Sequence, residues 1–343
     1  MKNVFYNLSF NKTSPKLVKD DTVKVKTPIS HWAKKFPSLK AGITRPFIDK
    51  LVIRYNLQDL SDPEGGKGVI LEQLKFLLKS SDHPEYCSTN IENNGFTMNL
   101  TVKPPKSTSR IFIAVKPFKK SVHFLRITLN PSKLSMSDMV WFKKEFSNIT
   151  NHLSNYETLC NLKGAIADIH ITCDIVGIAV DDLEINHAQK KKSLSYESSS
   201  GRLESKYYNL STSESQTYIY NKRRELTDKS KTPMYEGALH SRVERRIDTK
   251  ACIKSLAGIN NPFLKLGIRT ANYAEHSKDL NFTHLLFFQA VFSRGLDKTL
   301  RLLPDNVKDE YTNLYNETMV DIWEPKKIWS YWSDYIKSSG VLP

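Results

Sequence analysis

The chain has few cysteines, and none of them sits in a familiar metal or redox pattern. The four are Cys87, Cys160, Cys173 and Cys252, and none lies in a C-x-x-C pair or at zinc-site spacing from a histidine. We therefore expect buried thiols in a reducing compartment. There is also no run of 18 apolar residues and no apolar core of signal-peptide length near the N-terminus. The sequence predicts a cytoplasmic protein that makes no use of a membrane.

Several common catalytic motifs are also missing. The sequence contains no G-x-x-x-x-G-K-[ST] phosphate loop, so ATP hydrolysis is not expected. It contains neither H-E-x-x-H nor G-x-S-x-G, which disfavours a zinc metalloprotease and an α/β-hydrolase.

Acidic residues are too few to balance the basic ones. Lys and Arg number 51 against 36 Asp and Glu, which gives a net charge of +15 and a pI near 9.4. Hydrophobic residues make up 39% of the chain and charged residues 25%, a balance typical of packed globular proteins. The basic excess favours a polyanion partner, because neutralising phosphates releases counterions. Basic residues cluster with aromatic ones, which favours nucleic acid over a basic but uninvolved surface.

Apolar periodicity predicts an α+β fold. Residues 1–40 are lysine-rich and weakly periodic, so we expect a flexible basic arm. We expect strands near 47–56, 96–102, 110–115, 123–129, 165–178, 206–210, 216–222 and 242–248. We expect helices near 69–79, 137–153, 180–191 and 249–256, with Ser137 and Asp138 as caps of the second and a polar loop over 190–201.

The order of these elements repeats, which suggests an internal duplication. The halves 41–155 and 160–265 each run strand, helix, several strands, helix, and would form two antiparallel β-sheets with packed helices in one domain, 41–265. Residues 266–343 are expected to be a helical C-terminal region, with helices near 283–292, 308–320 and 326–337. Core packing explains Trp329 and Trp332 in the last helix, and a DNA-contacting appendage is the alternative.

Two strands carry the densest set of reactive side chains. Side chains two apart share a face of a strand, so we expect Tyr218, Tyr220, Lys222 and Arg224 to lie together. The same spacing places Arg242, Glu244 and Arg246 on one face of a later strand. The strand over 165–178 alternates as well, with polar residues on one face: Asp168, His170, Thr172 and Asp174.

These residue types suit a tyrosine that cuts a phosphodiester. The phenol, with a pKa near 10, would attack phosphorus, while a divalent metal and flanking cations neutralise the phosphate oxygens. On this hypothesis Tyr220 is the nucleophile, the metal ligands are His170, Asp174 and Glu244, and the phosphate grips are Lys222, Arg242 and Arg246.

Each of these residues also has a plainer interpretation. Tyr220 could be a packing residue of its strand, and His170 a hydrogen-bonded surface histidine. Asp174 could end its strand, and Glu244 could serve only as an ion-pair partner of its arginine neighbours.

Five stretches resemble the Rep_trans type of rolling-circle replication initiators, and within it the gene II-type nicking proteins of filamentous phages. The likeness covers about residues 45–265. The stretches are R-P-F-I-D-K-L-V-I from Arg45, L-R-I-T-L-N-P-S-K-L from Leu125, A-D-I-H-I-T-C-D from Ala167, T-Y-I-Y-N-K-R-R-E-L from Thr217 and H-S-R-V-E-R-R-I from His240.

The resemblance implies a site-specific, metal-dependent DNA nickase. Such an enzyme leaves a 5′-phosphotyrosine and a free 3′-OH that primes synthesis, and it later rejoins the displaced strand. Tyr220 matches the nucleophile, with Lys222 after it, and Glu244 and Asp174 match metal-binding acids. His170 stands where the family has its first acid, and Asp168 stands where it has Arg; these are departures. The implied cofactor is Mg²⁺ or Mn²⁺.

The resemblance also implies partners. These are double-stranded origin DNA and single-stranded DNA, in the cytoplasm of the host cell if the gene is phage-borne. From their residue types and positions, we expect the DNA contacts to come from Tyr218, Arg223, Arg224, Arg242 and Arg246. A host helicase and a second copy of the chain, as a homodimer, are further candidates. The alternative function is a non-catalytic DNA-binding protein, a replication accessory or copy-control factor. An RNA-binding protein is disfavoured because no RNA module is recognisable.

Overall fold

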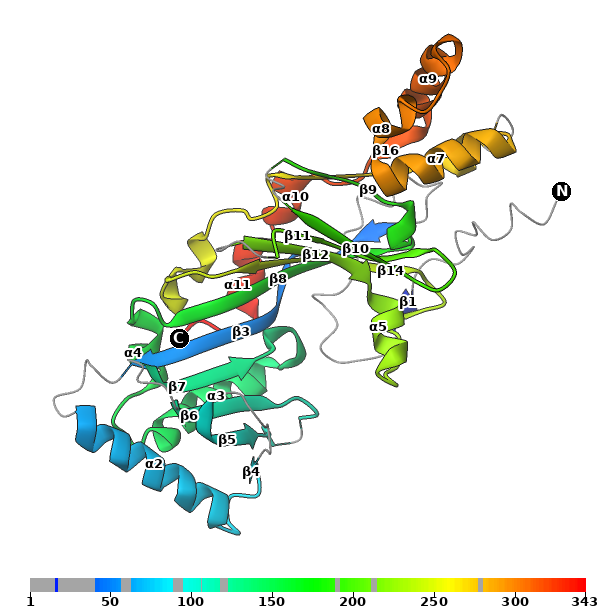
Figure 1. Cartoon of the computed structure of the whole chain (residues 1–343). Coiled ribbons are helices and arrows are strands. Elements are labelled where there is room, and N and C mark those ends of the chain that lie inside the picture. Colours follow the sequence, from blue (N-terminus) through cyan, green and yellow to red (C-terminus); the bar gives the residue numbers. More distant parts are fainter. Residues whose placement is uncertain are drawn as a thin grey trace. The chain divides into compact units, whose positions relative to one another are not determined.

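The computed structural model (Figure 1) describes residues 16–17, 41–56, 63–88, 95–105, 107–117, 123–188, 192–210, 215–276 and 280–343. The chain divides into two compact units, each built from separate segments. Unit A consists of Met1–Arg45, Cys173–Arg245 and Asn261–Ser330, and unit B of Pro46–Thr172, Arg246–Asn260 and Tyr331–Pro343.

Unit B contains an antiparallel sheet in the order β8-β3-β7-β6-β5-β4. The strand expected over 47–56 is present, with Leu51, Val52 and Ile53 buried and Arg54 exposed. The strands are β3 (Phe47–Asn56), β4 (Tyr86–Ser88), β5 (Phe96–Val102), β6 (Ile111–Pro117), β7 (His123–Leu129) and the first part of β8 (Ile166–Val176).

Helices pack against one face of this sheet. The ring of Phe146 in α3 meets that of Tyr55 in β3 edge-on, with centroids 5.8 Å apart. The N-cap of α3 is Ser135, not Ser137 or Asp138, and Asp138 completes a capping box with it. The helical elements of unit B are α2 (Pro63–Lys79), η5 (Pro131–Lys133), α3 (Met136–Ile149), α4 (Tyr156–Asn161), η7 (Ile253–Gly258) and α11 (Trp332–Ser338).

The C-terminal helix α11 belongs to the core of unit B. Trp332 is 1% exposed, and its indole Nε1 donates to the Leu256 carbonyl at 2.8 Å. The phenol oxygen of Tyr335 accepts the backbone N–H of Ile48 at 3.0 Å. The core-packing interpretation of Trp332 is therefore confirmed. Trp329 lies in unit A, where its ring packs against Phe263.

Unit A contains a second group of strands in the order β10-β11-β12-β14-β8, with β2 paired to β8, and a three-stranded sheet in the order β16-β15-β9. A short pair, β1 with β13, lies apart from these sheets. The strands are β1 (Lys16–Leu17), β2 (Gly42–Ile43), β9 (Glu184–His187), β10 (Ser193–Glu197), β11 (Leu203–Tyr208), β12 (Ser215–Asn221), β13 (Tyr235–Glu236), β14 (His240–Ile247), β15 (Leu266–Ala271) and β16 (Met319–Asp321).

The helices of unit A form a separate apolar cluster around α7 and α9. Phe287, Phe288 and Val291 of α7 pack with Tyr315 of α9. The ammonium of Lys206 in β11 donates to the Phe292 carbonyl at 2.7 Å, which holds α7 to the sheet. The helical elements are η6 (Val180–Asp182), α5 (Lys222–Asp228), α6 (Tyr273–His276), α7 (Phe282–Arg294), α8 (Leu296–Leu300), η8 (Asp305–Val307), α9 (Lys308–Thr318) and α10 (Pro325–Trp329).

The α+β class is confirmed, with a large antiparallel sheet, a smaller one, and helices that include C-terminal ones. Several local predictions are wrong. Of the expected helix 180–191, the described residues 180–188 form η6 and β9; of the expected loop 190–201, the described residues 192–201 contain β10; and 249–256 yield only the 3-10 helix η7. The C-terminal region contains β15 and β16, and the helix expected over 326–337 is broken between α10 and α11.

The compact units also follow a different division from the expected halves 41–155 and 160–265. The reason is that β8 and β14 each supply residues to both units. In the described part of the chain, no helix is long and apolar enough to span a membrane.

Candidate active site

The strand β12 presents Tyr218 and Tyr220 and then stops at Asn221. The Asn221 side chain accepts the backbone N–H of Arg224 at 3.0 Å and so caps helix α5, which begins at Lys222. The prediction that Lys222 and Arg224 continue the strand face of the tyrosines is therefore wrong. A side chain that caps the first turn favours a helix directly after it.

The structure brings Tyr220 and Glu244 together. The Tyr220 hydroxyl donates to Glu244 Oε2 at 3.3 Å, and Glu244 is only 3% exposed on β14. The Lys222 ammonium lies 5.6 Å from the centre of the Tyr220 ring, although Lys222 now comes from α5. It also forms a short ion pair with Glu225. A phenol, a buried carboxylate and an ammonium thus meet within unit A.

Beside this group lies a buried charge cluster on β8 and β14. Arg242 donates from Nε and Nη2 to the two carboxylate oxygens of Asp174, at 2.6 and 3.0 Å. His240 Nε2 lies 3.1 Å from Asp174 Oδ2, and the Tyr235 ring meets the His240 ring edge-on at 4.7 Å. Asp174 is 0% exposed and Arg242 2% exposed.

These neighbours control the ionisation of the cluster. Burial alone would raise the pKa of Asp174, but Arg242 and His240 together hold it well below its ordinary value. Burial lowers the pKa of His240, and Asp174 only partly offsets that effect. At neutral pH the cluster therefore holds an ionised Asp174, a cationic Arg242 and a neutral His240.

The predicted metal ligands Asp174 and His170 belong to different compact units and contact different side chains. Both oxygens of Asp174 accept from Arg242. His170 belongs to unit B, where its Nε2 lies 2.9 Å from Asp168 Oδ2, and Asp168 also pairs with Lys50 at 3.4 Å. Among the residues that the structure describes, no three His, Cys, Asp or Glu side chains lie close enough to hold a metal ion together. The described side chains therefore do not form a complete metal site by themselves.

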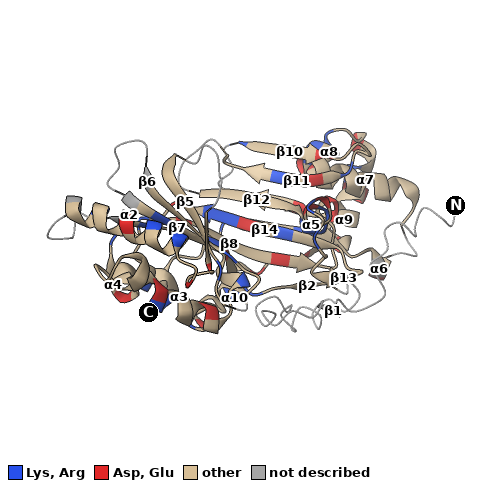
Figure 2. Ribbon diagram, turned by 90° about the horizontal axis from the view of Figure 1, so that it is seen from below, with Lys and Arg blue, Asp and Glu red and all other residues tan. Residues whose placement is uncertain are grey.

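The predicted DNA-contact residues differ in their environment. Arg223 and Arg224 are exposed on α5, and Arg224 pairs with Glu204 at 2.7 Å and with Asp228 at 3.4 Å. Arg246 is half-buried near the end of β14. Tyr218 is also half-buried, and its hydroxyl donates to Gln216 Oε1 at 2.7 Å. Figure 2 shows the basic residues of β14 and α5 among the other charged positions.

A row of tyrosines across the sheet was missed in the sequence. Tyr207 of β11 lies directly opposite Tyr218, with ring centres 4.9 Å apart. Tyr196 of β10 continues the row at 5.4 Å from Tyr207 and is 53% exposed. The row shares a strand face with Tyr220, because Tyr218 and Tyr220 are two residues apart. Expecting a loop over 190–201 removed Tyr196 from consideration.

Arg245 is a second residue that the sequence did not single out. It points to the opposite face of β14, where it donates to Thr217 and Ser215 of β12. Its Nη1 also lies 3.1 Å from His187 Nε2 of β9. Burial lowers the pKa of Arg245 to about 10, so it remains a cation at neutral pH. Through these contacts Arg245 links three strands of unit A, β9, β12 and β14.

Comparison with known proteins gives little beyond this geometry. No family model matches the chain, and no curated protein matches it. Among solved structures, the chain is similar to the rolling circle replication initiator protein from Geobacillus stearothermophilus, with a TM-score of 0.36 and 11% sequence identity. The match covers 67% of this chain and 87% of that one. A likeness at this level carries no conclusion about the activity of this chain.

Proposed function

We propose that this protein is a rolling-circle replication initiator that nicks one strand of origin DNA through Tyr220. The observation that carries the proposal is the hydrogen bond from the Tyr220 hydroxyl to the buried Glu244 carboxylate. A buried carboxylate that accepts a phenol's proton is suited to increase the nucleophilicity of its oxygen. The sequence resemblance to Rep_trans initiators supports the same residue, Tyr220.

The proposed step exchanges one phosphodiester for another. As the Tyr220 proton moves to Glu244, the phenolic oxygen attacks phosphorus, and the bond from phosphorus to the 3′ oxygen breaks. The released oxygen takes up a proton and becomes the free 3′-OH, while the 5′ phosphate stays on Tyr220. Attack by a 3′-OH on this phosphotyrosine reverses the step and rejoins the strand, without another energy source.

The surrounding cations have separate roles in this proposal. Lys222, whose ammonium lies 5.6 Å from the centre of the Tyr220 ring, would stabilise negative charge on the phenolic oxygen and the adjacent phosphate. Arg242 is buried in its pair with Asp174, so it is not among the proposed contacts to the DNA backbone, which are Arg246, Arg223 and Arg224. The tyrosine row adds rings beside Tyr220 on which unpaired bases could stack.

The proposal includes a divalent metal ion that the protein and the DNA phosphates would bind together. Mg²⁺ is commonly held by one or two carboxylates together with substrate phosphates, and Glu244 is the predicted carboxylate, through Oε1, because Tyr220 donates to Oε2. When bound, Mg²⁺ or Mn²⁺ would neutralise charge on the non-bridging phosphate oxygens. The expected ligand roles of Asp174 and His170 stay predictions; Asp174 contacts Arg242, and His170 contacts Asp168.

The experiment is a nicking assay on supercoiled DNA that carries the chain's own gene and its flanking sequence. Wild type is incubated with Mg²⁺ or Mn²⁺ and in parallel with EDTA, and products are separated before and after protease treatment. We expect open circles with protein on one 5′ end, and their loss with EDTA. Tyr220→Phe should abolish nicking but keep DNA binding, while Tyr218→Phe, the matched control from the same face, should still nick. Cleavage by Tyr220→Phe would contradict the assignment of the nucleophile.

One observation favours a second function. The Asp174 carboxylate is fully engaged by Arg242, so the strand expected to supply metal ligands instead supplies a structural ion pair. A non-catalytic DNA-binding replication accessory would need no metal. Such a protein would bind its DNA with a steep salt dependence and leave it uncut with either ion, which would favour this alternative over the nickase.

A further inference from the structure

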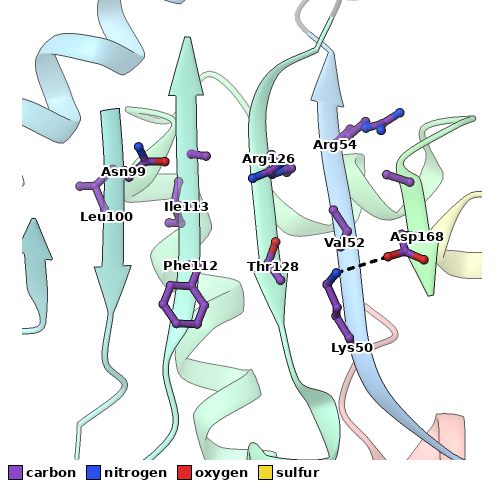
Figure 3. Close-up of a pocket in the computed structure, with 12 residues that line it drawn as sticks. Lys50, Val52, Arg54, Asn99, Leu100, Phe112, Ile113, Arg126, Thr128 and Asp168 are labelled. Atoms are coloured by element: carbon purple, nitrogen blue, oxygen red, sulfur yellow. Dashed lines mark hydrogen bonds and ion pairs between the residues drawn. The ribbon is translucent and has the colours of Figure 1, made fainter. Parts of the chain in front are cut away.

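Unit B carries a basic hollow on the sheet face opposite α3. On β3, Tyr55 points toward Phe146 of α3, and the preceding residue, Arg54, points to the other face. There the strands β3, β5, β6, β7 and β8 line a hollow of about 420 Å³ (Figure 3). It lies within one compact unit, and none of its residues is part of the Tyr220 site.

The floor of this hollow is made of small side chains in register. Val52 of β3 lies directly opposite Thr128 of β7, and Ala114 of β6 lies opposite Arg126 of β7. Phe112 also lies opposite Thr128, from β6. Its ring is 39% exposed, which is unusual for a phenylalanine in an inner strand. A large ring beside small neighbours leaves room for a flat group above it.

The rim of the hollow is strongly basic. Lys50, Arg54 and Arg126 line it, against one acid, Asp168, which pairs with Lys50 at 3.4 Å. Arg54 and Arg126 occupy directly opposite positions on neighbouring strands, an arrangement that destabilises a sheet when the charges are alike. Burial and the charge of Arg54 both lower the pKa of Arg126. A bound anion would relieve this repulsion.

We propose that the hollow in unit B binds a segment of single-stranded DNA, with a base on Phe112 and a phosphate between Arg54 and Arg126. Single-stranded DNA is the ligand that fits both the exposed Phe112 ring and the neighbouring cations Arg54 and Arg126. Arginines alone would suit any phosphate, but the flat face of a base reaches a protein ring only when the base is unstacked from its neighbours. The proposal extends the proposed function, because it assumes that DNA is the substrate, and it assigns unit B the task of holding the displaced strand.

Binding can be measured without cleavage in the Tyr220→Phe background. The probe is a fluorescein-labelled oligothymidylate of about 16 nucleotides, the upper site size of a small single-strand-binding fold, followed by anisotropy over a series of salt concentrations. Replacing Arg54 and Arg126 together by Gln should reduce the slope of log K against log salt by about 0.7, the value for losing one phosphate contact of a single strand. The matched control, Lys79→Gln with Lys144→Gln, removes two exposed lysines from α2 and α3 and should leave the slope unchanged.

The aromatic half of the hollow has its own test. Phe112→Ala should weaken oligothymidylate binding by about 5- to 100-fold, the usual range for losing one stacked base. Phe76→Ala removes a phenylalanine that is 59% exposed on α2 and should have no effect. Thermal unfolding of each variant checks that it is folded, and only variants whose midpoints are not lowered are compared.

The possible outcomes separate this inference from the proposed nickase. Losses confined to the Arg54, Arg126 and Phe112 variants support the hollow, even if wild type fails to nick supercoiled DNA. Equal losses in variants and controls, or no loss in any, overturn it, even if nicking through Tyr220 is found. Tighter binding of the matching oligouridylate would overturn the choice of DNA.

Discussion

The buried pair between Arg242 and Asp174 permits a quantitative test of how this site is held. Arg242→Met removes the guanidinium but keeps much of its length, and leaves Asp174, which is 0% exposed, without its bidentate partner. Leaving one charge of a buried pair uncompensated costs about 3–5 kcal/mol. Asp174→Leu should cost a similar amount, because it leaves the Arg242 guanidinium in the same position.

The double variant Asp174→Leu with Arg242→Met distinguishes a lost pair from lost packing. Replacing a whole buried ion pair with apolar residues of similar volume is often neutral or stabilising, so most of the loss should be recovered. Urea unfolding followed by tryptophan fluorescence gives the free energy of unfolding of all four proteins. Losses below about 1 kcal/mol in both single variants, or a double variant as unstable as the two losses added, would refute this account of the pair.

The pH dependence of Arg242→Met adds an independent check. In wild type the lowered pKa of Asp174 makes its contribution to stability complete above the unfolded pKa, near 4, and lost only below that value. Without Arg242, burial opposes the ionised form of Asp174, so the variant regains stability as acid protonates either the carboxyl or His240 beside it. The gap between wild type and Arg242→Met should therefore narrow between pH 7 and pH 5. A constant gap would indicate that Asp174 is not the group left uncompensated.

Two further predictions concern other parts of the structure. Burial and Asp181 raise the pKa of Asp182 to about 7 against the opposing effect of Arg202, so its contribution to stability falls as pH rises from about 4 to 7. Asp182→Asn should then be more stable than wild type at pH 8, by about 2–4 kcal/mol, and equal to it near pH 4; equal unfolding curves at both pH values would contradict this. Tyr335→Phe leaves the buried Ile48 N–H without its acceptor, which should cost about 1–3 kcal/mol in urea unfolding, whereas Tyr196→Phe on the exposed edge strand should cost nothing measurable.

Strands rich in apolar and β-branched residues were predictable from the sequence alone. The expected strands 47–56 and 123–129 coincide with β3 and β7, because residues of these types favour an extended chain that packs against a core. Helix α3 was also located, although its cap lies two residues before the expected one. In these segments the local pattern and the packing favour the same structure.

Segments whose pattern conflicts with their packing were misassigned. β10 is exposed along its whole length, so its polar sequence resembles a loop, and only pairing with β11 makes it a strand. The paired residues of β9 and β15 are at least 79 positions apart in the sequence. Pairing over such a distance cannot be detected from the residues around either strand. The start of α5 did have a signal in the sequence, because Asn221 is a good N-cap residue and is followed by good helix formers. The alternation of Tyr218, Tyr220 and Lys222 led to the prediction of a continued strand instead.

The candidate site was predictable in its components but not in its pairings. Tyr220 and Glu244 were both chosen from side-chain type and spacing, and the structure places their oxygens 3.3 Å apart. Spacing within β8 and β14 could not reveal that Asp174 lies against Arg242, because that contact depends on the register between the two strands. Whether Tyr220 is a nucleophile stays a prediction.

The composition of β14 is hard to explain by stability alone. Of its first six residues, five are polar or charged and each is less than a tenth exposed: His240, Ser241, Arg242, Glu244 and Arg245. An inner strand of apolar residues would avoid the desolvation cost of these groups. Locally unfavourable choices concentrate where a chain performs chemistry or binding. The one carboxylate of β14 contacts the one tyrosine of β12 that the motifs single out, so this strand is where the energetic cost and the proposed chemistry coincide.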